Sequence, residues 1–101
     1  VNGSTIPSGV TLTANPPVQQ TAGAQVIFTA SASGGSGSYE YRFWLNSGGV
    51  WSVAQLYGTG NTLTWDTTIA DVGNHYVWVD VRNAGSAADV EVWQQIPYLI
   101  Q

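Results

Sequence analysis

The stretch from Ala70 to Val79, ADVGNHYVWV, decides the fold class of this 101-residue chain. Asp71 and Gly73 favour a tight turn, because both residue types suit the backbone conformations that a chain reversal needs. From His75 to Asn83 apolar side chains then alternate with others, and this period of two indicates a half-buried strand. One face of that strand carries Val77, Val79 and Val81. The opposite face carries Tyr76, Trp78, Asp80 and Arg82. The segment therefore predicts a turn that leads into a central strand of a β-sandwich.

Short β-rich runs, separated by clusters of Gly, Asn, Pro and Ser, fill the rest of the chain, and no segment has a convincing helical period. Further strands are expected at Val10–Ala14, Val18–Thr21, Gln25–Ser33, Tyr39–Asn46, Val50–Tyr57, Thr62–Asp66 and Ala87–Gln94. Short strands at regular spacing, with turn residues between them, are typical of a two-sheet sandwich. The sequence thus predicts an all-β fold of two antiparallel sheets with about seven strands and no disulfide.

The chain has the length of one domain. Residues 1–9 are polar and rich in turn residues, so they are expected to be a linker, with the domain at residues 10–95. Residues 96–101 are expected to be a tail or the start of the next linker, because Pro97 cannot donate a hydrogen bond to a ladder. The chain begins at Val1 and has no methionine, which indicates a piece cut from a longer protein.

Charge decides which face of a strand points into the core. In the run Tyr39–Asn46 the face with Glu40, Arg42 and Trp44 is expected outside, because burying an unpaired charge costs several kcal/mol. The inward positions are then Val26, Phe28, Ala30, Ala32, Tyr39, Tyr41, Phe43, Leu45, Leu63, Trp65, Ala88, Val90 and Val92, with Ile69 anchoring the crossing after residue 66. For Val50–Tyr57 the sequence does not decide which side chains point into the core.

Composition excludes several classes of partner and site. With two Arg, no Lys and six acidic residues the net charge is −4, whereas binding to nucleic acid or to an anionic membrane needs clustered Lys and Arg. No apolar run approaches the roughly 18 residues of a membrane span. The absence of cysteine excludes thiolate nucleophiles and cysteine-based zinc sites. We therefore expect no nucleic-acid partner and no direct membrane insertion.

Candidate catalytic and metal-binding groups are few. His75 is the only histidine, and a structural role is favoured over a metal ligand or a general base, which needs an orienting partner nearby. Asp71 is close in sequence, but a cap of the turn explains it better. A glycosidase-like pair is conceivable among Asp80, Asp89 and Glu91, yet cross-strand salt bridges to the arginines explain these carboxylates better. The sequence thus predicts no enzyme, no catalytic residue, no metal ligand and no cofactor.

An aromatic surface is the one feature that points to a ligand. With the facing given above, the outer face of one sheet carries Trp44, Tyr76, Trp78 and Trp93, alternating with Arg42, Arg82, Asp80, Asp89 and Glu91. Flat rings beside carboxylates and guanidinium groups resemble the platforms on which β-sandwich carbohydrate-binding modules stack sugar rings, and large exposed apolar patches mark interaction sites. Two alternatives stay open: the rings stabilise the sheet as cross-strand pairs, or a linker or neighbouring domain covers them. The candidate ligand or partner surface is Trp44, Tyr76, Trp78, Trp93, Arg42 and Arg82.

Three segments carry a family resemblance. They are residues 11–14 together with 25–38, residues 39–43, and residues 71–77 with the sequence DVGNHYV. The last resembles the D-x-G-x-Y-x-C pattern, and together they resemble the immunoglobulin-like sandwich of bacterial surface repeats, including the PKD-like group. The resemblance places His75 where the corner tyrosine would be, and Val77 and Ala30 where the paired cysteines would be, so it implies a disulfide-free version. The WDFGDG loop of the PKD-like group is absent.

This resemblance implies a non-catalytic structural, spacer or adhesion module of a larger secreted or cell-surface bacterial protein. Its expected partners are the neighbouring domains of the same chain, with a polysaccharide or a surface protein as further candidates, and the isolated domain is expected to be a monomer. The alternative is a carbohydrate-binding module that uses the outer aromatic face. Both functions place the protein outside the cell.

Overall fold

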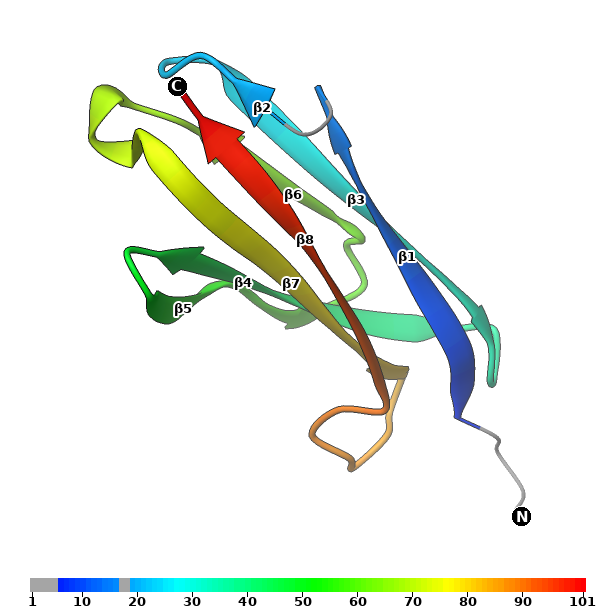
Figure 1. The fold of residues 1–101 in the computed structure, drawn as a ribbon. Helices are drawn as coiled ribbons and strands as arrows, with labels where there is room; N and C mark the ends of the chain where they lie inside the picture. The colour runs from blue at the N-terminus through cyan, green and yellow to red at the C-terminus, as the bar shows by residue number, and fades with distance from the viewer. Residues whose placement is uncertain (1–5, 17–18) are drawn as a thin grey trace.

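A computed structural model describes residues 6–16 and 19–101. Within these residues the chain forms eight strands and one short 3-10 turn (Figure 1). The elements are β1 (Pro7–Asn15), β2 (Gln19–Gln20), β3 (Gln25–Gly34), β4 (Tyr39–Ser47), β5 (Val50–Gly58), β6 (Thr62–Asp66), η1 (Ile69–Asp71), β7 (Gly73–Asn83) and β8 (Val92–Ile100). In this part of the chain no helix is long and apolar enough to cross a membrane.

The strands form two sheets in a sandwich-like, all-β arrangement, as predicted. One sheet has the order β1-β3-β6, and the other has the order β2-β8-β7-β4-β5. The pairings are antiparallel except one: β2 runs parallel to β8, with Gln19 opposite Leu99 and Gln20 opposite Ile100. The prediction of wholly antiparallel sheets is therefore wrong at this edge. The predicted strand Val18–Thr21 corresponds to β2, and Val18 lies outside the described residues.

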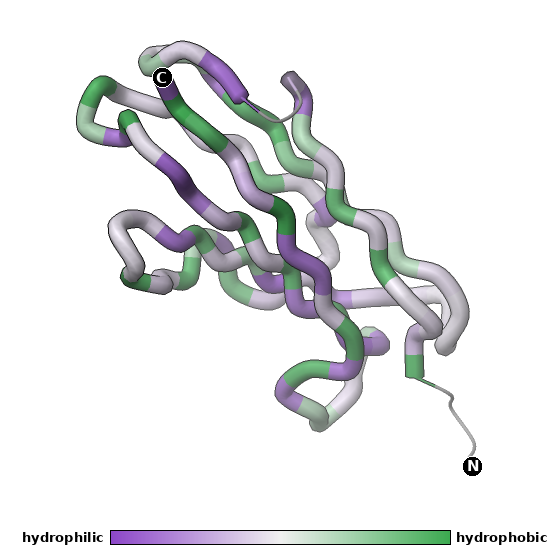
Figure 2. The backbone as a smooth tube through the Cα atoms, viewed as in Figure 1, coloured by the Kyte–Doolittle hydropathy of each residue, from purple (hydrophilic) through white to green (hydrophobic). Residues whose placement is uncertain are grey.

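The core lies between the two sheets and follows the predicted alternation. Fully buried or nearly so are Val26, Phe28, Ala30, Tyr41, Phe43, Leu63, Val77, Val79 and Val81, while Ala32, Tyr39 and Leu45 pack against them half-buried. Figure 2 shows the same pattern as hydrophobic and hydrophilic positions that alternate along the strands. Because strand side chains alternate between faces, the residues between these positions point outward.

The crossing from β6 to β7 differs from the prediction. Ile69 is 86% exposed, because η1 buries no residue against either sheet. The buried anchor is Thr67, whose hydroxyl donates to the Ala24 carbonyl at 2.6 Å and accepts from the Gly23 amide at 3.1 Å. Trp65 is half-buried rather than buried, and its ring packs at the edge of the core near Phe28.

The last strand lies later in the chain than predicted. Residues 84–91 connect β7 to β8 instead of forming the first part of a strand, and β8 extends from Val92 to Ile100. Tyr98 and Ile100 are buried, so the predicted tail belongs to the sandwich. Pro97 is tolerated because β2 pairs with β8 only at its last two residues, so no strand is hydrogen-bonded to that side of β8 at Pro97.

Because β8 begins later than predicted, two side chains that were expected in the core lie elsewhere. Val92 packs against the core as predicted. Val90 instead lines a hollow on the outer surface, and Ala88 lies in the connection, where its carbonyl accepts from Arg82. Both lie in the loop, whose path the alternating sequence pattern does not determine.

The first strand begins earlier than predicted. β1 starts at Pro7, which is fully buried, so residues 7–9 of the predicted linker belong to the sandwich. Proline suits the first residue of a strand, where its missing N–H costs no ladder bond. Residues 1–5 of that linker lie outside the described residues.

Candidate binding surface

A row of tryptophans crosses the outer face of the five-stranded sheet. One side chain comes from each of four neighbouring strands: Trp93 from β8, Trp78 from β7, Trp44 from β4 and Trp51 from β5. We call these residues the tryptophan row. Trp44 and Trp78 lie directly opposite each other in the ladder, whereas Trp93 is opposite Asp80 and Trp51 is opposite Asn46. The row therefore runs diagonally across the sheet.

The outer members of the row, Trp93 and Trp51, each contact the ring of Trp78. Trp78 and Trp93 stack with 4.0 Å between ring centroids and 11° between planes. Trp51 meets Trp78 edge to face at 5.9 Å. Aromatic pairs of these geometries contribute roughly 0.5–1.5 kcal/mol beyond the area they bury. Trp93 remains 51% exposed and Trp51 40% exposed, so both rings also face solvent.

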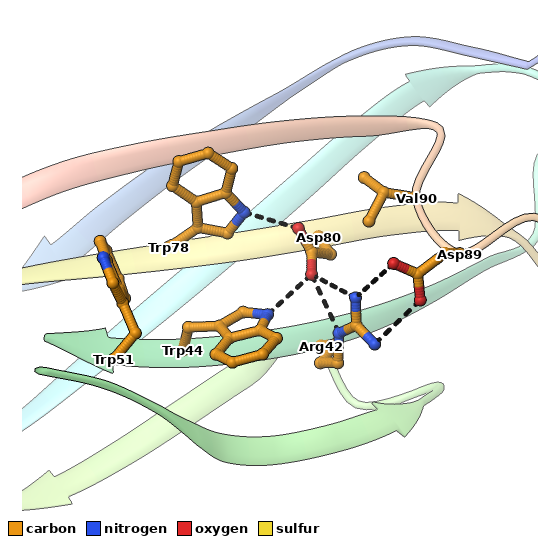
Figure 3. A pocket seen from close by; sticks show the side chains of 7 residues that line it. All are labelled: Arg42, Trp44, Trp51, Trp78, Asp80, Asp89 and Val90. Carbon is orange, nitrogen blue, oxygen red and sulfur yellow. Dashed lines mark hydrogen bonds and ion pairs between the residues drawn. The ribbon is translucent and has the colours of Figure 1, made fainter.

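A buried carboxylate orients the inner members of the row. Asp80 is only 3% exposed. It accepts hydrogen bonds from the indole Nε1 of Trp44 at 2.7 Å and from the indole Nε1 of Trp78 (Figure 3). The guanidinium of Arg42 completes its partners, with Nε at 2.9 Å and Nη2 at 2.8 Å. A buried charge is tolerated only with such partners, and here the partners fix both indoles.

Arg42 connects the buried carboxylate of Asp80 to the exposed carboxylate of Asp89. Its guanidinium reaches both Asp89 carboxylate oxygens, at 3.3 and 3.4 Å, and lies 5.2 Å from the Trp44 ring centroid. Burial of Arg42 opposes its charge, but the hydrogen bonds to Asp80 and Asp89 outweigh this and raise its pKa. Asp89 itself has an 82% exposed side chain. It is thus the carboxylate of this network that solvent or a ligand can reach.

Tyr57 of β5 lies beside the same network. The guanidinium carbons of Arg42 and Arg82 lie 4.6 and 3.9 Å from its ring centroid. Its hydroxyl donates to the backbone carbonyl of Asp89. Burial, followed by the negative charge of Asp80, raises the pKa of Tyr57 to about 12. Arg82 pairs in turn with Glu40 at 2.8 Å, so both arginines are engaged with carboxylates.

The network and the tryptophan row surround an open hollow of about 400 Å³. Its lining consists of Arg42, Trp44, Trp51, Trp78, Asp80, Asp89 and Val90 (Figure 3). The three indoles form one side and the ion pairs form the other. A hollow with aromatic walls and a few polar groups at one end has the composition of a small-ligand site.

The predicted surface residues fall into three groups. Arg42, Trp44 and Trp78 meet at the hollow, and Trp93 stacks on its wall. Tyr76 lies on the same outer face and is 46% exposed, but it does not line the hollow. Arg82 packs its guanidinium on the ring of Tyr57, and it does not line the hollow either.

The sequence interpretation missed Trp51 and Tyr57. Both come from β5, whose facing stayed open because no charged residue marks an outer face, and two register irregularities after Val53 also interrupt its alternation. The salt bridges of Asp80 and Asp89 to Arg42 are as expected. The expectation for Glu91 is wrong: it accepts from the Asn83 amide at 2.7 Å and the Ser86 hydroxyl at 3.1 Å, so it stabilises the turn after β7.

His75 is remote from the hollow, on the inner face of β7. It is 5% exposed, and its Nε2 hydrogen-bonds the carbonyl of Asp71. Its Nδ1 lies 3.1 Å from the Asn46 carbonyl and 3.0 Å from the Ser47 hydroxyl, so both ring nitrogens have hydrogen-bond partners within the fold. Its contacts are those of a structural residue. Among residues 6–16 and 19–101, no three His, Cys, Asp or Glu side chains are grouped to hold a metal ion.

Comparison of the chain with known proteins gives no match to a protein-family model, a curated protein or a solved structure.

Proposed function

We propose that this chain is a non-catalytic binding module that holds a neutral carbohydrate chain against the tryptophan row. The observation that carries the proposal is the pair of half-exposed rings, Trp51 and Trp93, flanking two indoles that a buried carboxylate fixes in place. Sugar rings present flat apolar faces to aromatic rings and hydroxyl groups to carboxylates. The hollow offers both kinds of partner side by side.

The rigidity of the row supports binding. Asp80 bonds both inner indoles, and Trp93 stacks on Trp78, so the rings lose little freedom when a ligand arrives. Ordering a mobile side chain at an interface costs about 0.5–1.5 kcal/mol. A pre-ordered aromatic surface avoids most of that cost.

The charges favour a neutral ligand over an acidic one. Arg42 and Arg82 are the only arginine or lysine residues of the chain, and both are paired with carboxylates. The exposed charge at the hollow is the carboxylate of Asp89. It would accept hydrogen bonds from sugar hydroxyls and repel the carboxylates of an acidic polysaccharide.

Electrophoresis through gels that contain a soluble polysaccharide tests this proposal. Neutral glucans, xylans and mannans are expected to slow the domain, and alginate and polygalacturonate are not. Trp93→Ala and Trp51→Ala should abolish the retardation, because they remove the exposed rings. Ile69→Ala is the matched control, since Ile69 is 86% exposed on η1, away from the row. Absence of retardation by every neutral polysaccharide, or equal retardation of all variants, would overturn the proposal.

An immunoglobulin-like fold is the second part of the proposal. The hydrogen bond from His75 to the Asp71 carbonyl has the form of a tyrosine corner, in which a side chain near the start of a central strand bonds the backbone upstream. A histidine would make the corner here. A crystal structure in which His75 pointed to solvent would remove this support.

A spacer is the second candidate function, and the shape of the molecule favours it. The domain measures 50 × 23 × 17 Å, and β1 begins at one end while β8 ends at the other (Figure 1). Such a module would separate its neighbours on a bacterial surface and need no ligand. Retardation in the gels that Trp93→Ala abolishes would count against a pure spacer.

A further inference from the structure

The edge strand β5 is open along one side. It pairs with β4 alone and ends the five-stranded sheet. Four of its apolar side chains are exposed: Val50 by 68%, Trp51 by 40%, Val53 by 41% and Leu56 by 75%. No charged residue occurs between Arg42 and Asp66. Edge strands of soluble proteins are usually protected by charges, prolines or bulges, since their free N–H and C=O groups recruit other strands.

The protection of β5 is confined to its second half. The register with β4 shifts at the pairs around Phe43, so the strand is irregular from Val53 onward. The first half is regular, with Val50 to Val53 opposite Ser47 to Trp44. In an antiparallel ladder every second residue directs its backbone groups away from the partner strand. Val50–Val53 therefore presents a flat, uncharged edge that can accept another strand.

The other sheet edges lack this combination. β6 has five residues and ends in the charged Asp66, and β2 has two residues. β1 begins with a proline, and its exposed Thr11 and Thr13 hydroxyls already bond carbonyls of β3. β5 is thus the edge on which an apolar strand would be best accepted.

We propose that Val50–Val53 pairs with the same segment of a second copy, antiparallel and about a two-fold axis. The second copy presents a strand that is already formed, so pairing orders no flexible peptide. Each chain carries a net charge of −4, and the uncharged edge is where two copies approach with least repulsion. Two-fold antiparallel pairing places only the residue at the axis opposite its own copy, and the absence of charge on β5 removes like-charge conflict at every pair.

The pairing joins two five-stranded sheets edge to edge. It brings the Trp51 residues of both copies near the axis, so the two tryptophan rows face the same side of one continuous sheet. The family resemblance led us to expect a monomer, and the exposure of the β5 side chains became visible only in the structure. The inference does not depend on carbohydrate binding, since its test contains no sugar.

Sedimentation equilibrium over a wide range of protein concentrations tests the pairing. The mass is expected to rise from one chain to two as concentration increases. Val53→Lys should raise the dissociation constant at least tenfold, because it places two like charges across the axis. Ile69→Lys adds the same charge on η1 and should leave the constant unchanged. A single-chain mass at every concentration, equal effects of both lysines, or growth beyond two chains would overturn the proposal.

Cross-linking provides a second measurement that does not depend on the charged variant. The natural chain has no cysteine, so Ser52→Cys introduces a single thiol in the pairing segment. Mild oxidation should convert it to a covalent dimer much faster than Ser36→Cys, whose thiol lies in the exposed loop between β3 and β4. Equal rates for the two variants would show that the copies do not meet at β5.

Discussion

Asp80 divides the tryptophan row into two indoles that it bonds and two that it does not. The two indoles that it bonds, Trp44 and Trp78, are half-buried, whereas Trp51 and Trp93 are exposed. The carboxylate also holds Arg42, which would otherwise be a half-buried cation with only the long contacts to Asp89. A network of this kind is stable when every member is satisfied and costly when one is removed.

Asp80→Ala is expected to lower the free energy of unfolding by about 3–5 kcal/mol, the usual cost of breaking a buried ion pair. It leaves Arg42 without its main partner and two indole N–H groups without acceptors. Urea denaturation followed by circular dichroism measures the change. Asp89→Ala is the control, with an expected loss below about 1 kcal/mol, because that carboxylate is mostly exposed. Equal losses for both variants would mean that Asp80 does not organise the face.

At the scale of the elements, β8 shows a limit of the sequence pattern: the pattern predicts a strand here but not where it begins and ends. The alternation of residues 87–94 has the period of a strand, yet residues 84–91 form a connection held by Glu91 and Arg82. Those contacts are hydrogen bonds between individual side chains and the backbone in or next to this connection, and the periodicity of the sequence does not report them. Pro97 likewise suggests a strand end unless the neighbouring strands are known.

Tyr98→Ala tests whether residues 96–100 belong to the core. Tyr98 is 1% exposed, its ring packs edge to face on Phe28, and its hydroxyl donates to the Pro16 carbonyl at 2.6 Å. We expect a loss of about 3–5 kcal/mol in the free energy of unfolding, as for other buried aromatic side chains. Gln95→Ala on the exposed part of β8 should change it by less than about 0.5 kcal/mol. If residues 96–101 were a tail outside the core, both substitutions would change the free energy of unfolding by the same small amount.

The residues of the tryptophan row could be predicted where inner and outer side chains alternate regularly along a strand. Trp44, Trp78 and Trp93 lie on β4, β7 and β8, where charged neighbours indicate the outer face. Trp51 lies in the regular first half of the edge strand β5, where no charged neighbour marks the outer face. The role of Asp80 depends on indole orientation across two strands, which no single segment encodes.

At the scale of the whole molecule, the sheets are unequal. Five strands face three, so part of the larger sheet has no covering partner. Trp51 and Val53 lie on the outer face, which neither sheet covers, so the imbalance accounts only for the uncovered inner side of β5, while the centre of the sandwich is fully buried. It could not be predicted from the sequence, because sheet membership depends on pairings between distant strands.

Alkaline pH should destabilise the whole fold through its tyrosines. The pKa of Tyr57 is raised by burial to about 12 in the folded protein, and an unfolded tyrosine has a pKa of about 10. Stability from the neutral phenol is therefore complete below pH 10 and lost as pH rises toward 12. Burial also raises the pKa of Tyr41 and Tyr98 in the same direction.

Urea midpoints measured from neutral pH to pH 12 test this dependence. Tyr57→Phe should make the alkaline decline shallower, since phenylalanine has no proton to lose. Tyr76→Phe, on the exposed part of the same face, should leave the slope unchanged. An identical decline in both variants would assign the alkaline sensitivity to other groups.

The parallel pairing of β2 with β8 makes the domain resist tension along its long axis. Its bonds include Gln101 N–H to the Gln20 carbonyl and Ala22 N–H to the Gln101 carbonyl, both at 2.9 Å. Tension applied at the two ends of the sandwich pulls these strands past each other, so the bonds are sheared together rather than opened one after another. A stretched chain would therefore yield only when this short clamp breaks as a unit.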